Sequence, residues 1–216
     1  MYKAIIWDLD GTLLDTTEGV KYAVKYTIDQ LGLKRLDEET IGLFVGPPMQ
    51  LSFKKYFQMN DIEALRAANL FRTNYKEKSL LKARLYPNTL EVLNKLKLYG
   101  YKMAVATNKS HENAITILNH FGVAEFCDFM MGSDLEGRLK KADIIKICLD
   151  RLSVKPKEAL YIGDSTFDME GARTVGMDFV GVSYGFGFRK GDNIGYPVLD
   201  SMKEIEEFCN DFRYSL

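Results

Sequence analysis

Two aspartates two residues apart follow the first apolar run of the chain. Asp8 directly follows the apolar run Ala4–Trp7, and Asp10 directly precedes Gly11-Thr12. An apolar run that ends at such a breaker predicts a short buried strand, and open α/β sheets bind ligands beyond the carboxyl ends of their strands. Two like charges held close are costly unless a cation or a shifted pKa relieves them, and Mg²⁺ prefers oxygen ligands. The pair therefore predicts a metal site, with an acidic helix-capping turn as the alternative.

A second pair of aspartates, Asp164 and Asp168, follows another apolar run, Ala159–Ile162. This run also predicts a buried strand that ends in acidic residues. Asp168 stands near the expected start of the next helix, so its carboxylate suits a helix N-cap, a metal site, or both. The sequence thus places acidic residues at the ends of two predicted strands.

Uncharged polar residues follow a third apolar run, Met103–Ala106. The hydroxyl of Thr107 and the amide of Asn108 can hydrogen-bond phosphate oxygens from the carboxyl end of a strand. The same two residues can instead open the turn before a helix that Ser110 caps. On residue types alone, both interpretations stay open.

Outside residues 16–84, apolar runs of strand length alternate with amphipathic stretches of helix length. Strands are expected at residues 3–9, 103–107, 128–131, 159–162, 179–182 and 197–199, and helices at 89–99, 110–121, 142–152, 168–175 and 202–212. Gly100, Gly122 and Gly176 follow three of these helices, as is typical of helix C-termini. Strand–helix alternation predicts a parallel sheet with helices on both faces.

Residues 16–84 interrupt this alternation with helical periodicity and no convincing strand. Helices are expected at about residues 18–31, 38–45, 48–57 and 62–78. The stretch begins just after the loop that carries Asp8 and Asp10, and it ends near Pro87. We therefore predict two domains. Residues 1–15 and 85–216 form a doubly wound α/β core, and residues 16–84 form an all-helical insertion.

Composition limits the classes of function. The 216 residues can bury a sizeable core, and a net charge of −1 favours neither nucleic acid nor an anionic membrane. No apolar run approaches the length that crosses a bilayer, and the first strand starts too early for a signal peptide. The three cysteines are widely spaced and odd in number, which favours reduced thiols and a cytoplasmic protein.

The segment that begins with Asp8 and Asp10 resembles the nucleophile motif Asp-x-Asp-x-Thr/Val of the haloacid dehalogenase (HAD) superfamily. The resemblance implies that Asp8 attacks phosphorus and becomes an aspartyl phosphate. It implies that Asp10 is the general acid and base, which protonates the leaving oxygen and then activates water. Thr107 and Asn108 resemble the second motif of the family, which binds and orients phosphate.

The segment that contains Asp164 and Asp168 resembles the fourth HAD motif, Gly-Asp-Ser-x-x-Asp, which holds Mg²⁺. The resemblance implies that Asp164 is a direct metal ligand and that Asp168 binds the metal directly or through water. It also implies that Asp8 supplies a carboxylate oxygen and Asp10 its main-chain carbonyl.

The third HAD motif requires a lysine near a helix start, to neutralise the charges of the aspartate and the phosphate. Lys140 and Lys141 both precede the helix expected from residue 142. Some phosphatases of the family carry Lys-Ala-Asp at this point, and that form selects Lys141. The four motifs occur in the family's order, and the resemblance covers essentially the whole chain.

The helical insertion occupies the position of the helical cap in many HAD phosphatases, between the first two core strands. Within it, Gly46–Met49 predicts a stiff turn, because Pro48 suits a first helical turn and Gly46-Pro47 enforces a bend before it. This turn resembles the substrate-specificity loop of phosphoglycolate-phosphatase-like members. Its Gly-Pro-Pro sequence also resembles a 5′-nucleotidase-like branch, and an ordinary helix–helix turn is the alternative.

The sequence thus predicts an enzyme with a HAD-like, Rossmann-like core and a helical cap. We expect a Mg²⁺-dependent phosphatase that hydrolyses a small-molecule phosphomonoester and is phosphoglycolate phosphatase-like. A 5′-nucleotidase and a sugar phosphomutase are the alternatives. A dehalogenase would not need Asp10 as acid or a metal site at Asp164 and Asp168. The expected partner is the phosphate ester, with no nucleic acid polymer and no membrane, and the chain is a monomer or a homodimer.

Overall fold

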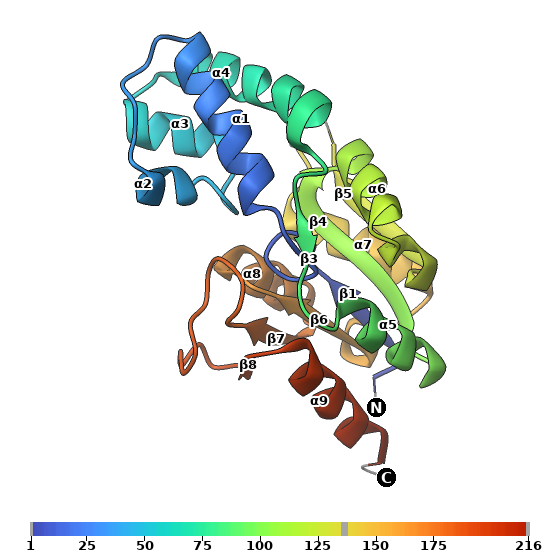
Figure 1. The fold of residues 1–216 in the computed structure, drawn as a ribbon. Helices are drawn as coiled ribbons and strands as arrows, with labels where there is room; N and C mark the ends of the chain where they lie inside the picture. The colour runs from blue at the N-terminus through green and yellow to red at the C-terminus, as the bar shows by residue number, and fades with distance from the viewer. Residues whose placement is uncertain (1, 135–137, 215–216) are drawn as a thin grey trace. The chain divides into compact units, whose positions relative to one another are not determined.

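The computed structural model describes residues 2–134 and 138–214 of the chain, which fold into two compact units (Figure 1). The core unit combines Met1–Asp15 with Leu85–Leu216, and the helical unit is Thr16–Arg84. Two short strands, β2 (Leu14–Asp15) and β3 (Arg84–Leu85), pair as a small sheet at the points where the chain passes between the units. The helical unit is therefore an insertion into a loop of the core unit.

The core unit is built on a six-stranded parallel sheet with the strand order β5-β4-β1-β6-β7-β8. Its central strands are almost wholly apolar, as expected when both faces of a parallel sheet are covered. The strands are β1 (Ala4–Trp7), β4 (Lys102–Ser110), β5 (Phe129–Ser133), β6 (Ala159–Gly163), β7 (Asp178–Val182) and β8 (Val198–Leu199). This sheet confirms the predicted doubly wound fold.

Strand β1 pairs with a parallel neighbour on each side. Trp7, its last residue, lies opposite Val105 of β4 and opposite Ile162 of β6. The chain adds β4 and β5 on one side of β1 and then crosses to add β6, β7 and β8 on the other. Ligands of doubly wound sheets bind outside the carboxyl ends of the strands at such a reversal. The residues that follow Trp7 and Ile162 occupy this position.

Helices cover both faces of the sheet (Figure 1). In the described part of the core unit they are α5 (Thr89–Leu98), α6 (His111–His120), α7 (Lys141–Leu152), α8 (Thr166–Val175) and α9 (Met202–Tyr214). Helices α7 and α8 pack on each other and against the sheet, while α5 packs against α9. A buried cluster that includes Ile6, Ala104, Ile145 and Tyr161 joins α7 to the central strands. Within the described residues, no helix has the length and apolar composition needed to cross a membrane.

The helical unit has its own apolar core. Its elements are α1 (Thr17–Gln30), α2 (Glu38–Gly42), α3 (Met49–Phe57), α4 (Asp61–Asn74) and the π-helical turn η1 (Tyr75–Ser79). Helix α1 packs against α4 and η1, and α3 packs against α4. The ring of Phe44 lies 5.3 Å from that of Phe53, edge to face, and 5.2 Å from that of Tyr56. These aromatic contacts anchor the segment between α2 and α3.

The helix expected over residues 62–78 is interrupted. Helix α4 ends at Asn74, and η1 continues the chain with wider π-helical hydrogen bonding. The change coincides with a close approach to α1, because the Ser79 hydroxyl donates to the carbonyl of Gly19 at 2.8 Å. A β-carbon at Gly19 would overlap the Ser79 carbonyl oxygen. The prediction of one regular helix was wrong here because apolar periodicity does not register a single wide turn.

Candidate active site

Asp8 lies at the carboxyl end of the central strand β1. The four residues of β1 are fully buried, and the backbone N–H of Asp8 donates to the carbonyl of Ile162 at 2.9 Å. This bond extends the pairing of β1 with β6 by one residue beyond Trp7, the last residue of β1. Asp8 itself is only 5% exposed. A carboxylate is therefore held in a fixed place at the ligand-binding edge of the sheet.

Asp164 and Asp168 follow the neighbouring strand β6. Asp164 comes directly after the strand, and Asp168 lies in the first turn of α8. One oxygen of Asp168, Oδ2, accepts hydrogen bonds from the N–H of Ser165 at 3.1 Å and its hydroxyl at 2.6 Å. Its other oxygen, Oδ1, faces Lys141. Ser165 is the N-cap of α8, so the N-cap prediction for Asp168 was wrong. Asp168 is the third helical residue, and its carboxylate stabilises the helix start and belongs to the acidic cluster.

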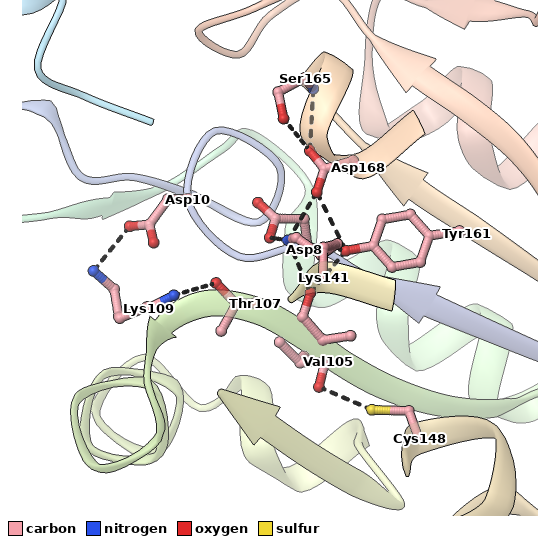
Figure 2. A network of polar contacts seen from close by, with 11 residues as sticks. Asp8, Asp10, Val105, Thr107, Lys109, Lys141, Cys148, Tyr161, Ser165 and Asp168 are labelled. Atoms are coloured by element: carbon pink, nitrogen blue, oxygen red, sulfur yellow. Dashed lines mark hydrogen bonds and ion pairs between the residues drawn. The ribbon is translucent and has the colours of Figure 1, made fainter. Parts of the chain in front are cut away.

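The ammonium group of Lys141, the first residue of α7, lies between two of these carboxylates (Figure 2). Its Nζ is 2.6 Å from Asp8 Oδ1 and 2.8 Å from Asp168 Oδ1. It also donates to the Ala106 carbonyl and to the Tyr161 hydroxyl, each at 3.2 Å. A buried charge is tolerated when it is paired and hydrogen-bonded in this way.

The adjacent lysine, Lys140, has a different place. It is exposed, and its backbone N–H donates to Asp143 Oδ2 at 3.1 Å, inside the first turn of α7. Lys141 is 7% exposed. Of the two candidate lysines, the structure brings only Lys141 to the aspartates.

Burial dominates the electrostatics of the cluster. It raises the pKa of Asp8 well above its ordinary value, and Asp168 adds to the rise while Lys141 opposes it. The pKa of Asp164 is raised to about 7, first by burial and then by Asp168. Burial lowers the pKa of Lys141, but Asp168 and Asp8 outweigh this effect and raise it overall. The lysine is thus held charged among carboxylates that repel one another.

Asp10 is oriented by a lysine that the sequence analysis did not identify. Lys109 Nζ lies 3.0 Å from Asp10 Oδ1, and the Lys109 side chain is only 7% exposed (Figure 2). The available signal was its place directly after Thr107 and Asn108, in a stretch expected at the edge of the site. Asp10 lies outside the cluster of Asp8 and its buried partners, so the two aspartates of the first motif occupy different environments.

Thr107 and Asn108 lie within β4 and not after it. The strand runs on to Ser110, and its register with β5 shifts along this stretch. Thr107 is buried, and its hydroxyl accepts a hydrogen bond from the N–H of Lys109 at 3.2 Å, whereas Asn108 is exposed. Among the described contacts, neither side chain bonds to an aspartate of the site. Ser110 is the N-cap residue of α6, as expected, but its side chain makes no capping hydrogen bond.

Two glycines make room for the charged side chains, and their role was also missed. A β-carbon at Gly171 of α8 would lie 2.6 Å from Lys141 Cγ, and one at Gly163 would lie 2.6 Å from Asp168 Cβ. Real β-carbons do not approach other atoms so closely, because interiors are close-packed. A glycine inside a helix usually signals only weaker helix propensity. The role of Gly171 depends on Lys141, which is distant in the sequence.

The acidic cluster has the chemistry of a site for a hard cation. One oxygen from each of Asp8, Asp164 and Asp168 lies within 4.8 Å of the others, and all three residues are buried. Lys141 pairs with Asp8 and Asp168, but no ion pair of Asp164 is seen among the described residues. Three carboxylates facing one ammonium leave uncompensated negative charge. Such an oxygen-rich group fits Mg²⁺.

Comparison with known proteins agrees with this geometry. Residues 5–182 match the family described as haloacid dehalogenase-like hydrolase. The chain is 33% identical to a 5′-nucleotidase of Pseudomonas aeruginosa, covering 86% of this chain and 85% of that protein. It is 30% identical to a phosphoglycolate phosphatase of Nitrosospira multiformis, covering 85% and 84% respectively. A crystal structure of a predicted phosphatase from Clostridium acetobutylicum superposes with a TM-score of 0.89, at 33% identity, over 98% of this chain and 99% of that one.

The chain therefore belongs to the haloacid dehalogenase-like hydrolase family. The family match extends from β1 to the end of β7, so it spans the helical unit and both strand ends that carry the aspartates. Together with the phosphatase relatives, it confirms the predicted family and enzyme class, a HAD-family phosphatase.

Proposed function

We propose that the protein is a Mg²⁺-dependent phosphatase that hydrolyses a small phosphomonoester through an aspartyl phosphate on Asp8. The observation that carries the proposal is the meeting of three buried carboxylates beside Lys141 at the carboxyl edge of the sheet. Asp8, Asp164 and Asp168 would hold the Mg²⁺ through carboxylate oxygens, and Asp10 through its main-chain carbonyl. When bound, the ion supplies positive charge to the phosphoryl oxygens.

In the first half-reaction, an Asp8 oxygen forms a bond to phosphorus while the bond from phosphorus to the leaving oxygen breaks. Lys141 holds the Asp8 carboxylate through a 2.6 Å hydrogen bond to Oδ1 and so fixes its orientation. The leaving alkoxide requires a proton, and Asp10 is the proposed donor. Lys141 stays charged and offsets the negative charge that develops on the phosphoryl group.

In the second half-reaction, water attacks the phosphorus of the aspartyl phosphate and the bond to Asp8 breaks. Asp10 accepts the proton of this water, inorganic phosphate leaves, and the Asp8 carboxylate is restored. The Lys109 ammonium, 3.0 Å from Asp10 Oδ1, holds the Asp10 carboxylate in place for this step. Lys109 is thus a positioning residue for the general base.

Phosphate binding is assigned to Thr107, Asn108 and Lys141. The Thr107 hydroxyl accepts a backbone hydrogen bond and can still donate its own proton to a phosphate oxygen. Asn108 is exposed, so its amide is available to a ligand. Lys141 supplies the positive charge. A hydroxyl, an amide and an ammonium together suit an anion with several acceptor oxygens.

We assign substrate selection to the helical unit, residues 16–84, in the role of a cap. The Gly46–Met49 turn is anchored by the buried side chains of Phe44 and Val45. Leu43 and Leu51, on either side of the turn, are 54% and 55% exposed. Exposed apolar side chains next to a stiff turn are suited to contact a ligand.

The substrate class is a small metabolite phosphate. Phosphoglycolate-like esters come first, because the stiff turn resembles the corresponding loop of that subgroup and one relative is a phosphoglycolate phosphatase. Nucleoside monophosphates are the second candidate, supported by the Gly-Pro-Pro sequence and the 5′-nucleotidase relative. A sugar phosphomutase would need groups that hold the substrate in a second orientation, and no such group has been identified.

We place the enzyme in the cytoplasm. Cys127, Cys148 and Cys209 are all free thiols, as is usual in a reducing compartment. Burial raises the pKa of each thiol to about 12, so the thiols stay protonated and unreactive.

A phosphate-release screen tests the proposed function. The purified chain is incubated with phosphoglycolate, nucleoside monophosphates and sugar phosphates, with Mg²⁺ or with a chelator in place of Mg²⁺. We expect release from one ester class, abolished by the chelator and absent in Asp8→Asn. Release that persists with the chelator or in Asp8→Asn would contradict the mechanism, and no release from any ester would contradict the substrate class.

A further inference from the structure

A short segment after β7 contacts two loops of the site, the one that carries Asp8 and the one that carries Asp164. We propose that Tyr184–Phe188, called the brace segment below, positions Asp164 against the nucleophile loop Asp8–Thr12. The inference rests on the proposed function, since it concerns the Mg²⁺ ligand Asp164. The hydrogen bonds of the brace segment to these loops run from Tyr184 Oη to Thr12 O (3.0 Å), from Phe186 N to Asp164 Oδ2 (2.6 Å) and from Phe188 N to Asp164 O (2.9 Å).

The contact between Phe186 and Asp164 fixes the carboxylate directly. Asp164 is only 3% exposed, and its Oδ2 accepts the backbone N–H of Phe186. The 2.6 Å separation is short for an N–H···O hydrogen bond, so this contact holds the Asp164 oxygen closely. The N–H belongs to the main chain, so its direction depends on the whole segment and not on a rotamer.

Glycines on both sides of Asp164 show how closely the brace segment approaches. A β-carbon at Gly185 would overlap the Gly11 carbonyl oxygen and lie 2.6 Å from Asp164 Oδ2. One at Gly187 would overlap the Asp164 carbonyl oxygen, and one at Gly11 would lie 2.6 Å from Asp164 Cγ. Gly185 and Gly187 do not have positive φ. They are therefore required for close approach and not for backbone conformation.

Both ends of the brace segment are anchored in the core unit. Phe188 is 4% exposed and its ring lies edge to face with that of Phe179 in β7, at 6.0 Å. The ring of Tyr184 lies 4.6 Å from that of Tyr86. An amide held between two packed aromatic residues keeps a constant direction, as a supporting group for a metal ligand requires.

The test compares Mg²⁺ binding by calorimetric titration of the full chain and its variants. Gly185→Ala places a methyl group against Gly11 and Asp164, and we expect the Kd for Mg²⁺ to rise about tenfold or more. Tyr184→Phe removes the hydroxyl that bonds to Thr12 O at 3.0 Å and also lies 3.2 Å from Met202 Sδ, and we expect a rise of about threefold. Gly42→Ala is the matched control, because a β-carbon there meets only Lys21 at ordinary contact distance, 3.6 Å.

Thermal unfolding of each variant separates positioning from folding. If Gly185→Ala does not fold, the milder Tyr184→Phe decides. Folded variants that bind Mg²⁺ as the wild type does would overturn the role of the brace segment. Asp164→Ala distinguishes this result from failure of the proposed function: equal Mg²⁺ binding by the wild type and Asp164→Ala would show that no metal site exists at Asp164. If Asp164→Ala alone lost Mg²⁺ binding, the result would agree with the proposed function and contradict only the role of the brace segment.

Discussion

The core unit and the helical unit differ in how far their paired charged side chains are exposed to solvent. The buried charged side chains among the described residues all belong to the core unit, and they are Asp8, Lys109, Lys141, Asp164 and Asp168. In the helical unit the ion pairs are solvent-exposed, as between Lys54 and Asp61 with side chains 39% and 80% exposed. Burial of charge is costly unless it is paired, whereas surface pairs contribute little. We therefore assign the chemistry to the core unit.

The helical unit is distinguished by exposed apolar surface. Among the residues that the structure describes, nine large hydrophobic residues are exposed, and seven of them lie in this unit: Tyr22, Tyr26, Leu43, Leu51, Ile62, Leu65 and Leu81. In the described residues of the core unit, which is the larger one, the exposed large hydrophobic residues are Leu98 and Phe167. Apolar surface on a unit without buried charge suits recognition and not bond making. The comparison predicts that core substitutions remove catalysis, while helical-unit substitutions change which substrate is used.

Asp8→Asn is the largest expected effect. An amide cannot serve as the nucleophile, so kcat for phosphate release should fall roughly 10⁴-fold or more. The fold should persist, because the amide keeps the size of the carboxylate and Lys141 keeps its 2.8 Å contact with Asp168. Phosphate release and thermal unfolding are the measurements. A variant with wild-type turnover would show that the reaction does not pass through Asp8.

Asp164→Ala should act through the metal. Loss of a direct ligand should weaken Mg²⁺ binding and lower kcat/KM on the order of 10³-fold at fixed Mg²⁺, since a bound cation contributes several kcal/mol. Asp143→Ala is the control, because Asp143 Oδ2 only accepts the N–H of Lys140 in the first turn of α7. Activity is measured across a Mg²⁺ titration. Equal shifts in the two variants would remove the basis for a metal at Asp164.

Lys141→Met tests the buried cation. The variant leaves Asp8 and Asp168 without their shared partner, so the free energy of unfolding should fall by about 3 kcal/mol. Loss of positive charge near the phosphoryl group should lower kcat roughly 10²-fold. Lys140→Met should change neither by much, because Lys140 is exposed. Denaturant unfolding and steady-state kinetics on both variants check this, and similar losses in the two would contradict the choice of Lys141.

The fold and the acidic cluster could be predicted because both depend on local patterns. Apolar runs of strand length indicate buried strands, and their carboxyl ends meet at one edge of the sheet, so Asp8 and Asp164 were bound to be neighbours once the topology was known. Lys141 was selected over Lys140 because Lys141-Ala142-Asp143 resembles one form of the third HAD motif, and the observed 2.6 Å contact with Asp8 agrees with that choice.

The supporting contacts could not be predicted, because each joins residues distant in sequence. Lys109 pairs with Asp10 across about a hundred residues, from a stretch of β4 whose register shift leaves no periodic signal. Gly171 makes room for Lys141, but a helical glycine shows nothing of its partner. The π-helical turn after Asn74 likewise depends on packing against α1. Tertiary close approach, not local propensity, decides these features.

The Pro47→Ala/Pro48→Ala double variant should have the smallest effect and the most selective one. Alanine at both positions loosens the Gly46–Met49 turn, because proline no longer restricts φ there. The ratio of kcat/KM for the best metabolite to that for p-nitrophenyl phosphate should fall about fivefold, which corresponds to about 1 kcal/mol of discrimination. Steady-state kinetics on both esters measure the ratio. The generic ester should suffer less because it depends less on the helical unit.

A control in the same unit keeps this result interpretable. Lys54→Ala removes an exposed ion pair with Asp61, and it should leave both kcat/KM values nearly unchanged, since such pairs contribute about 0–1 kcal/mol. If the double proline variant lowered kcat/KM for both esters in proportion, the turn would serve folding or chemistry and not selection. If it changed neither value, Gly46–Met49 would be an ordinary helix–helix turn. Only an unequal change supports the assignment of recognition to the helical unit and chemistry to the core unit.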